Sequence, residues 1–255
     1  GQHLAHLAAL ETVLAARGRL GFNSKFLIEM GEETGSPGLD EIVRANAADF
    51  AADAFFASDG PRTEIGHPNI TLGNRGAATF ELKVRYREGG HHSGNWGGLL
   101  ANPGIVLAHA LATITDAKGR ILVDAWRPEI PAGVREVLKG VDRDGGPGAP
   151  AIDDAWGEPG LSRIEKVVAF NAFEVLAFET GNPAAPVNAI PPTARAVCQL
   201  RYVVGTAQER ILDGLREHLA ARGLGMVEVA GPPTGASELF TASRTDHAHP
   251  YAVWL

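Results

Sequence analysis

The sequence predicts an α/β domain that is interrupted by a separate α+β domain of ferredoxin-like order. Two observations support this fold class. In the first 75 residues, two short apolar runs flank one helical segment, and each run is followed by carboxylates. After residue 75, alternating strands and helices follow the order strand, helix, strand, strand, helix, strand. We expect a partial α/β domain at 1–75, an α+β domain at 76–240 and a return of the first domain at 241–255.

The first element is predicted to be a helix. Leu4, Leu7, Leu10 and Leu14 recur at helical spacing, and Gly18 stands where a helix stop is expected.

Two short apolar runs then predict neighbouring strands of a parallel sheet. The first is Phe26–Met30 and the second is the stretch DAFFASDG at residues 53–60. Ser36 and Pro37 are typical of a helix N-cap and first turn, so we expect a helix from there to about Phe50. In such sheets, functional sites collect at the carboxyl ends of the strands.

The second domain begins with a strictly alternating strand, TFELKVRYRE at residues 79–88, which indicates a half-buried antiparallel strand. A helix is expected at Pro103–Thr115, an alternating strand at 195–204, a helix at 207–223 and a last strand at 225–231.

Residues 117–165 are rich in Gly, Pro and Asp, and only one clear short helix is predicted in them, near residues 132–139. We expect this segment to be an insertion or a long loop within the second domain.

Composition excludes several classes of protein. The 255 residues are 45% hydrophobic and 21% charged, and the net charge of −7 comes without long runs of one sign, so we expect no nucleic-acid partner and favour a small molecule or peptide. No apolar run approaches the roughly 18 residues that span a bilayer, so no membrane association is expected. The single cysteine, Cys198, excludes an internal disulfide framework and fits a reducing, cytoplasmic compartment.

The two ends of the sequence suggest a piece of a longer protein. It opens directly in a helical pattern without Met, and it stops as an apolar segment begins. We therefore draw no conclusion about export.

The first candidate site is the adjacent pair Glu32 and Glu33, in a loop of Gly, Ser, Thr and Pro after the first apolar run. Such a pair is either a solvated surface feature or a functional one, in which one carboxylate reaches a metal and its neighbour reaches the water bound to that metal. Asp59, after the second apolar run, supplies a third carboxylate at the same expected sheet edge and favours the functional interpretation.

The second candidate is the glycine-rich stretch EGGHHSGNWGG, with His91 and His92. Imidazoles there could be ligands, acid or base groups or donors to an anion, whereas the structural alternative is a flexible turn with exposed histidines. The third candidate combines Asn188, in a proline-stiffened loop, with Arg201 on the following strand, whose planar fork suits a carboxylate. Its alternative is an Asx turn beside a surface arginine.

Taken together and in this order, five stretches resemble one family. They are MGEETGSPGLDEIV, FFASDG, TLGNRGAATFELKV, HHSGNWGGLLANP and PVNAIPPTARAVCQLRYVVG. The family is the dinuclear zinc peptidases that include carnosine dipeptidases, acetylornithine deacetylase, succinyl-diaminopimelate desuccinylase and carboxypeptidase G. The resemblance implies an α/β catalytic domain interrupted by a ferredoxin-like lid domain, through which many members form homodimers.

The resemblance also implies roles for individual residues. Glu32 would be the general base, Glu33 a ligand of one zinc ion and Asp59 a ligand of the other, with manganese or cobalt as alternatives to zinc. His92 would donate to the substrate in a neighbouring subunit, and Asn188 and Arg201 would bind the substrate.

The sequence departs from the family at the metal site. The family's first metal-binding His, the acid beside it, the bridging Asp and the last His have no counterpart, and His247 and His249 come too early to be that last His. From the resemblance we still expect the full-length protein to be a metal-dependent hydrolase of a dipeptide or N-acyl amino acid. The alternative is that this chain alone is an inactive module for dimerisation and substrate recognition.

Overall fold

The structure is a computed structural model that describes residues 2–57, 70–143, 148–233 and 239–254. The chain divides into two compact units, Gly1–Arg62 and Thr63–Leu255. No helix in the described ranges is both long and apolar enough to cross a membrane.

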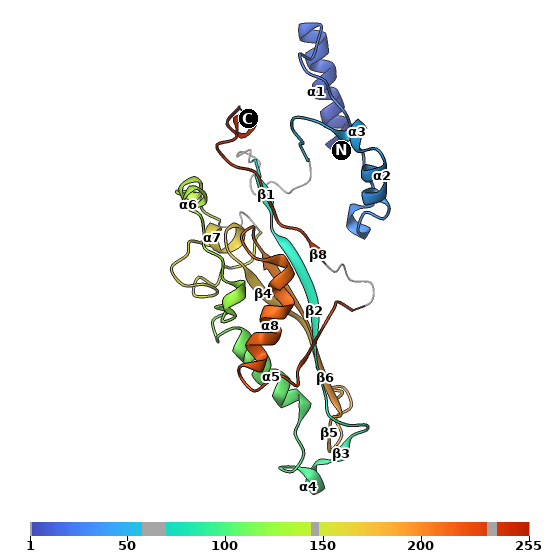
Figure 1. Cartoon of the computed structure of the whole chain (residues 1–255), viewed down its shortest axis with the longest axis vertical. Helices are drawn as coiled ribbons and strands as arrows, with labels where there is room; N and C mark the ends of the chain where they lie inside the picture. Colours follow the sequence, from blue (N-terminus) through green and yellow to red (C-terminus); the bar gives the residue numbers. More distant parts are fainter. Residues whose placement is uncertain (1, 58–69, 144–147, 234–238, 255) are drawn as a thin grey trace. The chain divides into compact units, whose positions relative to one another are not determined.

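The first unit is helical where it is regular. It contains the helices α1 (Gln2–Arg17), α2 (Leu39–Ala45) and α3 (Ala47–Phe50) and the short 3₁₀ helix η1 (Glu32–Thr34) (Figure 1). The predicted first helix is confirmed, including its stop: Gly18 has φ 70° and its N–H donates to the carbonyl of Leu14 over 2.8 Å.

The strand predicted at Phe26–Met30 is wrong, and so is the described part of the strand predicted at 53–60; residues 58–60 lie outside the described residues. Phe26–Met30 and residues 53–57 have no strand pairing, and the described part of the unit contains no other strand. A strand needs a neighbour that satisfies its backbone hydrogen bonds. The apolar side chains that suggested burial are exposed instead, with Met30 and Phe55 each 84% accessible.

The single predicted helix between these runs is two helices. Its N-cap is not Ser36 but Gly38, whose left-handed φ of 83° turns the chain into α2. Asn46 ends α2, and its side-chain amide donates to the carbonyl of Ile42 over 2.8 Å. An Asn side chain that bonds its own backbone competes with helix continuation, which explains the break before α3.

The second unit contains the ferredoxin-like domain that the sequence predicts. Its main strands form an antiparallel sheet in the order β4-β6-β2-β7, and β8 pairs with Ala77 and Ala78 near the start of β2. The strands are β2 (Gly76–Arg85), β4 (Ala172–Thr180), β6 (Thr193–Tyr202), β7 (Glu228–Ala230) and β8 (Leu239–Phe240).

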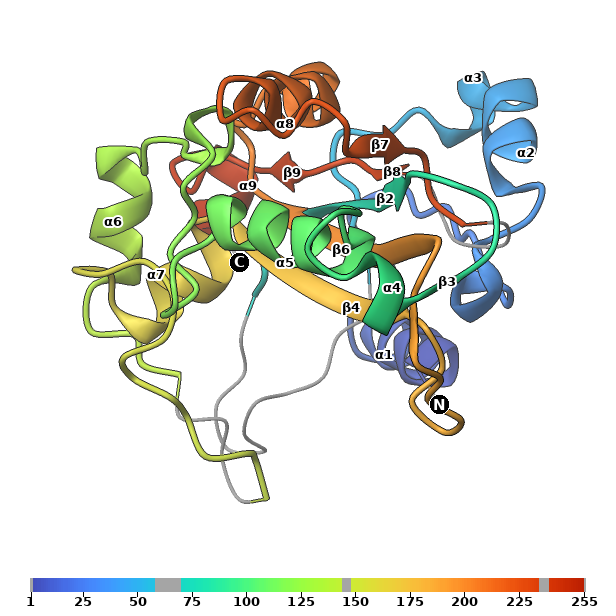
Figure 2. The same cartoon turned by 90° about the horizontal axis from the view of Figure 1, so that it is seen from below.

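Two helices, α5 (Pro103–Ile114) and α8 (Ile211–Ala220), cover one face of this sheet (Figure 2). Asn102 caps α5 by accepting from the N–H of Gly104 over 2.9 Å. The alternating residues of β2 and β6 meet these helices in one apolar core. Its fully buried members include Phe80, Leu82, Val84, Leu107, Ile114, Trp126, Leu200 and Leu215.

The opposite face of the sheet is more closed than the alternation predicts. Glu81 belongs to the polar side of β2, yet it is only 3% exposed. It forms ion pairs with Lys83 and, over 3.4 Å, with Arg195 of β6. These cations allow a carboxylate to be buried at a position that the pattern assigned to solvent.

The segment predicted as an insertion, residues 117–165, belongs to the core at its start. It contains the 3₁₀ helix η2 (Asp124–Trp126) and the helices α6 (Ala132–Leu138), as predicted, and α7 (Arg163–Val168). Trp126 is fully buried, and its indole N–H donates to the carbonyl of Ile211 over 2.9 Å. The start of the segment is therefore part of the core, since it fills the space beside α8.

Short elements lie at the two ends of the long strands (Figure 1). At one end, β3 (His91–His92) pairs with β5 (Ala189–Ile190) beside the one-turn helix α4 (Ser93–Trp96). At the other end, β1 (Gly73–Asn74) pairs with β9 (Ser243–Arg244). The elements that complete the unit are η3 (Gln208–Arg210) and α9 (Pro250–Trp254).

Candidate functional site

Glu32 and Glu33 form the first turn of η1, and both side chains are exposed. A tight turn holds them. The carbonyl of Gly31 accepts from the backbone N–H groups of Thr34 and Ser36, each over 2.9 Å, and Gly35 closes the turn with φ 86°. The glycines of this loop are therefore needed for the turn. The residue at its end has a left-handed backbone conformation, which glycine adopts without strain.

The described residues do not make a complete metal site. No group of three or more His, Cys, Asp and Glu side chains in the described ranges is placed to hold a metal ion. Asp59, the second predicted ligand, lies outside the described residues. The described donor set is smaller than the three or four ligands that a zinc site uses.

His92 ends β3 and is the N-cap of α4. Its Nδ1 accepts a hydrogen bond from the N–H of Gly94 over 3.1 Å. In a neutral imidazole one nitrogen accepts and the other donates, so this bond assigns the proton to Nε2. The exposed His92 ring therefore presents an N–H donor to the outside. The ring of His91 lies 6.4 Å from that of Trp96 instead.

The structure brings Asn188 and His92 together. His92 pairs with Ala189 in the β3–β5 ladder, and the N–H of Ser93 donates to the carbonyl of Asn188 over 2.9 Å. Both side chains are exposed at this end of the domain. We call residues 91–99 and 187–190 the lid tip.

Arg201 lies away from the lid tip. It pairs with Ala77 of β2 and with Ala172 of β4, near the opposite end of β6. Eight residue steps separate it from Thr193, where β6 begins, which is about 26 Å along an antiparallel strand. The predicted pair of Asn188 and Arg201 is therefore not close within one chain.

Arg75, between β1 and β2, is a residue that the sequence analysis did not single out. The next residue, Gly76, faces the core so closely that a Cβ there would clash with the ring of Tyr202. Alternation therefore directs Arg75 to the face of Ala77 and Arg201. Burial, and next the charge of Arg201, hold the pKa of the half-buried Arg75 guanidinium below its ordinary value.

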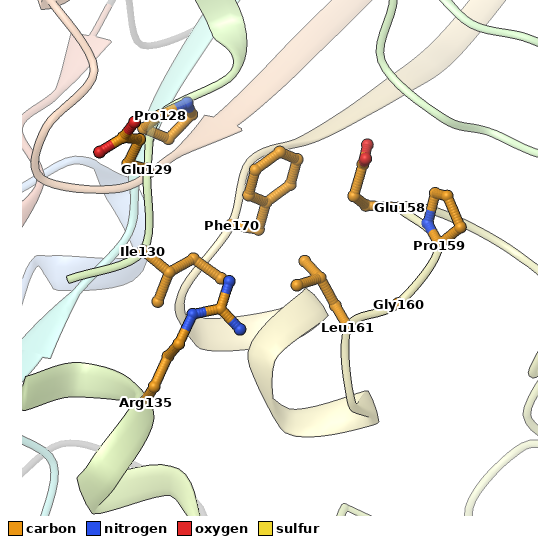
Figure 3. A pocket seen from close by; sticks show the side chains of 9 residues that line it. All are labelled: Pro128, Glu129, Ile130, Arg135, Glu158, Pro159, Gly160, Leu161 and Phe170. Atoms are coloured by element: carbon orange, nitrogen blue, oxygen red, sulfur yellow. The ribbon is translucent and has the colours of Figure 1, made fainter. Parts of the chain in front are cut away.

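A cavity of about 470 Å³ lies within and beside the segment that was predicted to be an insertion (Figure 3). None of the predicted site residues lines it. Its charged side chains are largely neutralised within the chain. Glu158 forms a bidentate pair with Arg127 over 2.7 and 2.8 Å, and Arg135 pairs with Glu165 over 2.7 Å. The lining residues are Pro128, Glu129, Ile130, Arg135, Glu158, Pro159, Gly160, Leu161 and Phe170.

The fold and the lid tip together define the class of protein: a two-layer α+β lid domain that carries a histidine loop at one end. The family model of the peptidase dimerisation domain matches residues 72–226. The chain belongs to this family of M20 peptidases, which confirms both the predicted family and the predicted α/β class with a dimerisation domain.

Several relatives are dipeptidases. The chain is 28% identical over 253 residues to a cysteinylglycine-S-conjugate dipeptidase of Corynebacterium striatum, covering 94% of this chain and 53% of that protein. It is 33% identical over 150 residues to the Beta-Ala-His dipeptidase of Mus musculus, covering 56% of this chain and 30% of that protein. The chain thus spans about half or less of the length of these relatives.

The fold agrees with a solved structure. An M20 family metallo-carboxypeptidase from Sulfolobus solfataricus superposes with a TM-score of 0.63 at 23% identity, covering 84% of this chain and 56% of that one.

Proposed function

We propose that the full-length protein hydrolyses a peptide or amide bond in a dipeptide or N-acyl amino acid, and that it does so as a metal-dependent homodimer. The observation that carries this proposal is the lid tip. There, a histidine with a fixed Nε2 donor and an amide side chain are held together and exposed, on a domain whose relatives are dipeptidases.

The carboxylate roles in the proposal follow the family resemblance. Glu32 accepts the proton of the attacking water and passes it to the leaving amine. Glu33 and Asp59 would be ligands of two zinc ions, with manganese or cobalt as alternatives. Such a metal, when bound, supplies a water of lowered pKa, toward about 7.

Homodimer formation resolves the separation of the substrate-binding residues. An extended dipeptide spans at most about 7 Å, whereas about 26 Å of β6 separates Arg201 from Thr193, which begins β6 at the end near His92. One chain cannot place both against one substrate. A two-fold dimer would bring the partner's His92 and the partner's Asn188 to the site that Arg201 serves.

The free edge of β4 is the proposed dimer surface. In the described part of the chain β4 pairs with β6 alone, and its outer edge exposes Val175, Leu176 and Phe178. Ile105 of the adjacent helix α5 is also exposed. An unpaired strand edge with apolar side chains is suited to self-association.

A second candidate function is that of an inactive dimerisation and substrate-recognition module. It is favoured because the family match covers residues 72–226, which leaves Glu32 and Glu33 outside it. Zinc-loaded full-length protein should hydrolyse dipeptides or N-acetyl amino acids and sediment as a dimer. Absence of hydrolysis across both substrate classes, in a protein shown to contain metal, would favour the module.

A further inference from the structure

Two aromatic side chains enclose His92 along the chain at the start of α4. His91 directly precedes the N-cap residue His92, and Trp96 is the fourth residue of the helix. The ring centroids of His91 and Trp96 lie 6.4 Å apart, at an interplanar angle of 49°, which is an ordinary aromatic contact. A contact between these two helix positions is a staple, which fixes the angle at which the chain enters the helix. His92 is the residue at the bend that this staple spans.

The β3–β5 ladder directs the two histidines to opposite sides. His91 pairs with Ile190, which is only 7% exposed. His92 pairs with Ala189. Paired residues of a ladder share a face, and successive residues of a strand alternate between faces. His91 therefore lies on the side of the buried Ile190, where it meets Trp96, whereas the exposed His92 lies on the other side.

The imidazole of His92 lies directly against the backbone of α4. A Cβ on Gly94 would be 2.9 Å from Cε1 and 3.2 Å from Nδ1 of His92, so only a glycine leaves room for the ring. The N–H of Gly94 donates to that Nδ1 over 3.1 Å. The donor of this bond belongs to the helix and the acceptor precedes it. The bond therefore keeps its geometry only while the angle between β3 and α4 is maintained.

We propose that Trp96 is a positioning residue for His92. With His91 it closes a staple across the bend, and the staple maintains the angle at which Nδ1 of His92 meets the N–H of Gly94. The Nε2–H donor of His92 is thereby held in one direction. The consequence for turnover rests on the proposed function; the consequence for the His92 ring does not.

Nuclear magnetic resonance of the full-length protein, labelled with ¹⁵N at histidine, tests the ring without turnover. Its His92 signals are those that H92A lacks. At about pH 8, where an ordinary imidazole is neutral, the wild type should show one protonated and one unprotonated ring nitrogen. W96A and H91A should each bring the two signals closer together, because a ring that loses its fixed bond to Gly94 exchanges between tautomers. W96F should keep the wild-type separation, since it retains an aromatic contact for His91.

The matched control is L99A. Leu99 is an apolar residue of the same lid tip and is 76% exposed, and its backbone N–H donates to the carbonyl of Trp96. Removal of its side chain leaves the staple in place, so L99A should keep the wild-type separation of the His92 signals. If W96A misfolds, H91A breaks the same contact from the other side and decides the question.

Kinetics of the same full-length variants test the consequence for turnover. W96A should lower kcat about two- to tenfold, the factor expected from one aromatic contact. KM should change little, because a donor to an oxyanion acts mainly in the transition state. In H92A protein the W96A substitution should cause no further loss of kcat, since its effect passes through His92. W96F should recover most of the wild-type kcat.

Two results would overturn the positioning role. One is an unchanged separation of the His92 signals in both W96A and H91A. The other is an equal loss of kcat from W96A in H92A and in wild-type protein, which would show that Trp96 acts on turnover by another route. If no dipeptide or N-acetyl amino acid is hydrolysed while the His92 signals respond as expected, the proposed function fails and the staple stands. If hydrolysis is observed and the signals do not respond, the proposed function stands and the positioning role fails.

Discussion

The N–H of Ser93 donates to the carbonyl of Asn188 over 2.9 Å, and this bond joins two loops that are far apart in the sequence. Because the acceptor is the backbone of Asn188, its side chain remains free for other contacts. The lid tip is therefore a hydrogen-bonded unit that holds His92 and Asn188 side by side.

Replacing His92 with Ala in the full-length protein should lower kcat by about 10² to 10³, because a donor to a developing oxyanion acts mainly in the transition state. Metal content should change little. H91A should have a much smaller effect, since the His91 ring lies against Trp96. Steady-state kinetics and metal analysis of both variants test this; an unchanged kcat in H92A would rule out the donor role.

Mixing two inactive dimers tests whether His92 acts in the partner subunit. An H92A dimer and an E32Q dimer should regain part of the activity after subunit exchange, because one site of each heterodimer has both an intact Glu32 and an intact partner histidine. Native mass spectrometry measures the exchange. Confirmed heterodimers without activity would show that His92 does not work across the dimer.

The adjacent carboxylates should respond differently to substitution. E32Q should retain metal and fold but lose turnover, because an amide cannot accept the proton. E33A should lose metal, because a ligand is removed. Metal stoichiometry measured beside activity separates the two roles, and equal metal loss in both variants would contradict the assignment.

A charge on the free edge of β4 should dissociate the dimer. Phe178 is exposed on this edge, and burying a lysine there without a partner is unfavourable. F178K should sediment as a monomer, whereas V137K should remain dimeric, since Val137 is an exposed apolar residue of α6. If F178K stays dimeric, the interface lies elsewhere.

The sequence predicted the α+β domain well because its signals are local. Alternation in β2 and β6 and the Asn102-Pro103 start of α5 each depend on a few neighbouring residues. The strands of the first unit failed for the opposite reason. Apolar runs such as Phe26–Met30 predict burial, but a strand exists only where another strand supplies hydrogen bonds.

The candidate site shows the same limit. Composition identified the loops of Glu32 and His92, yet it could not show that Asn188 lies with His92 while Arg201 lies at the other end of β6. That separation depends on strand register. The sequence analysis missed Arg75 because its lowered pKa depends on burial and on the charge of Arg201 across the sheet. An arginine before a glycine does not indicate either in the sequence.

A buried polar network beside the core should be important for stability. Asn171 donates to the carbonyl of Trp126 over 2.8 Å and accepts from the N–H of Val203 over 2.9 Å. Leucine would leave both groups unsatisfied, at about 1–3 kcal/mol each. N171L should therefore unfold at lower urea concentration. N182A is the control, because Asn182 is exposed; equal midpoints would show that the network is dispensable.

The buried histidine of α8 should make the stability of the lid domain depend on pH. His218 is 8% exposed, and its Nε2 lies 2.8 Å from the carbonyl of Thr113 on α5. Burial lowers the pKa of His218, the bond to Thr113 opposes this, and the charge of Arg222 lowers it further. Because the folded state binds the proton less strongly than the unfolded state, the stabilisation is complete above the unfolded pKa, about 6.5.

This stabilisation should be lost as the pH falls from about 6.5 through the lower pKa of the folded state, where the buried ring becomes charged. Urea unfolding of the wild type should therefore show a midpoint that decreases over this range. H218Q keeps a donor for Thr113 but does not titrate, so its midpoint should vary less with pH. H109Q is the matched control, because His109 is exposed and lies on α5, the helix that also carries Thr113. If H218Q and H109Q show the same slope as the wild type, another group determines the acid sensitivity of the domain.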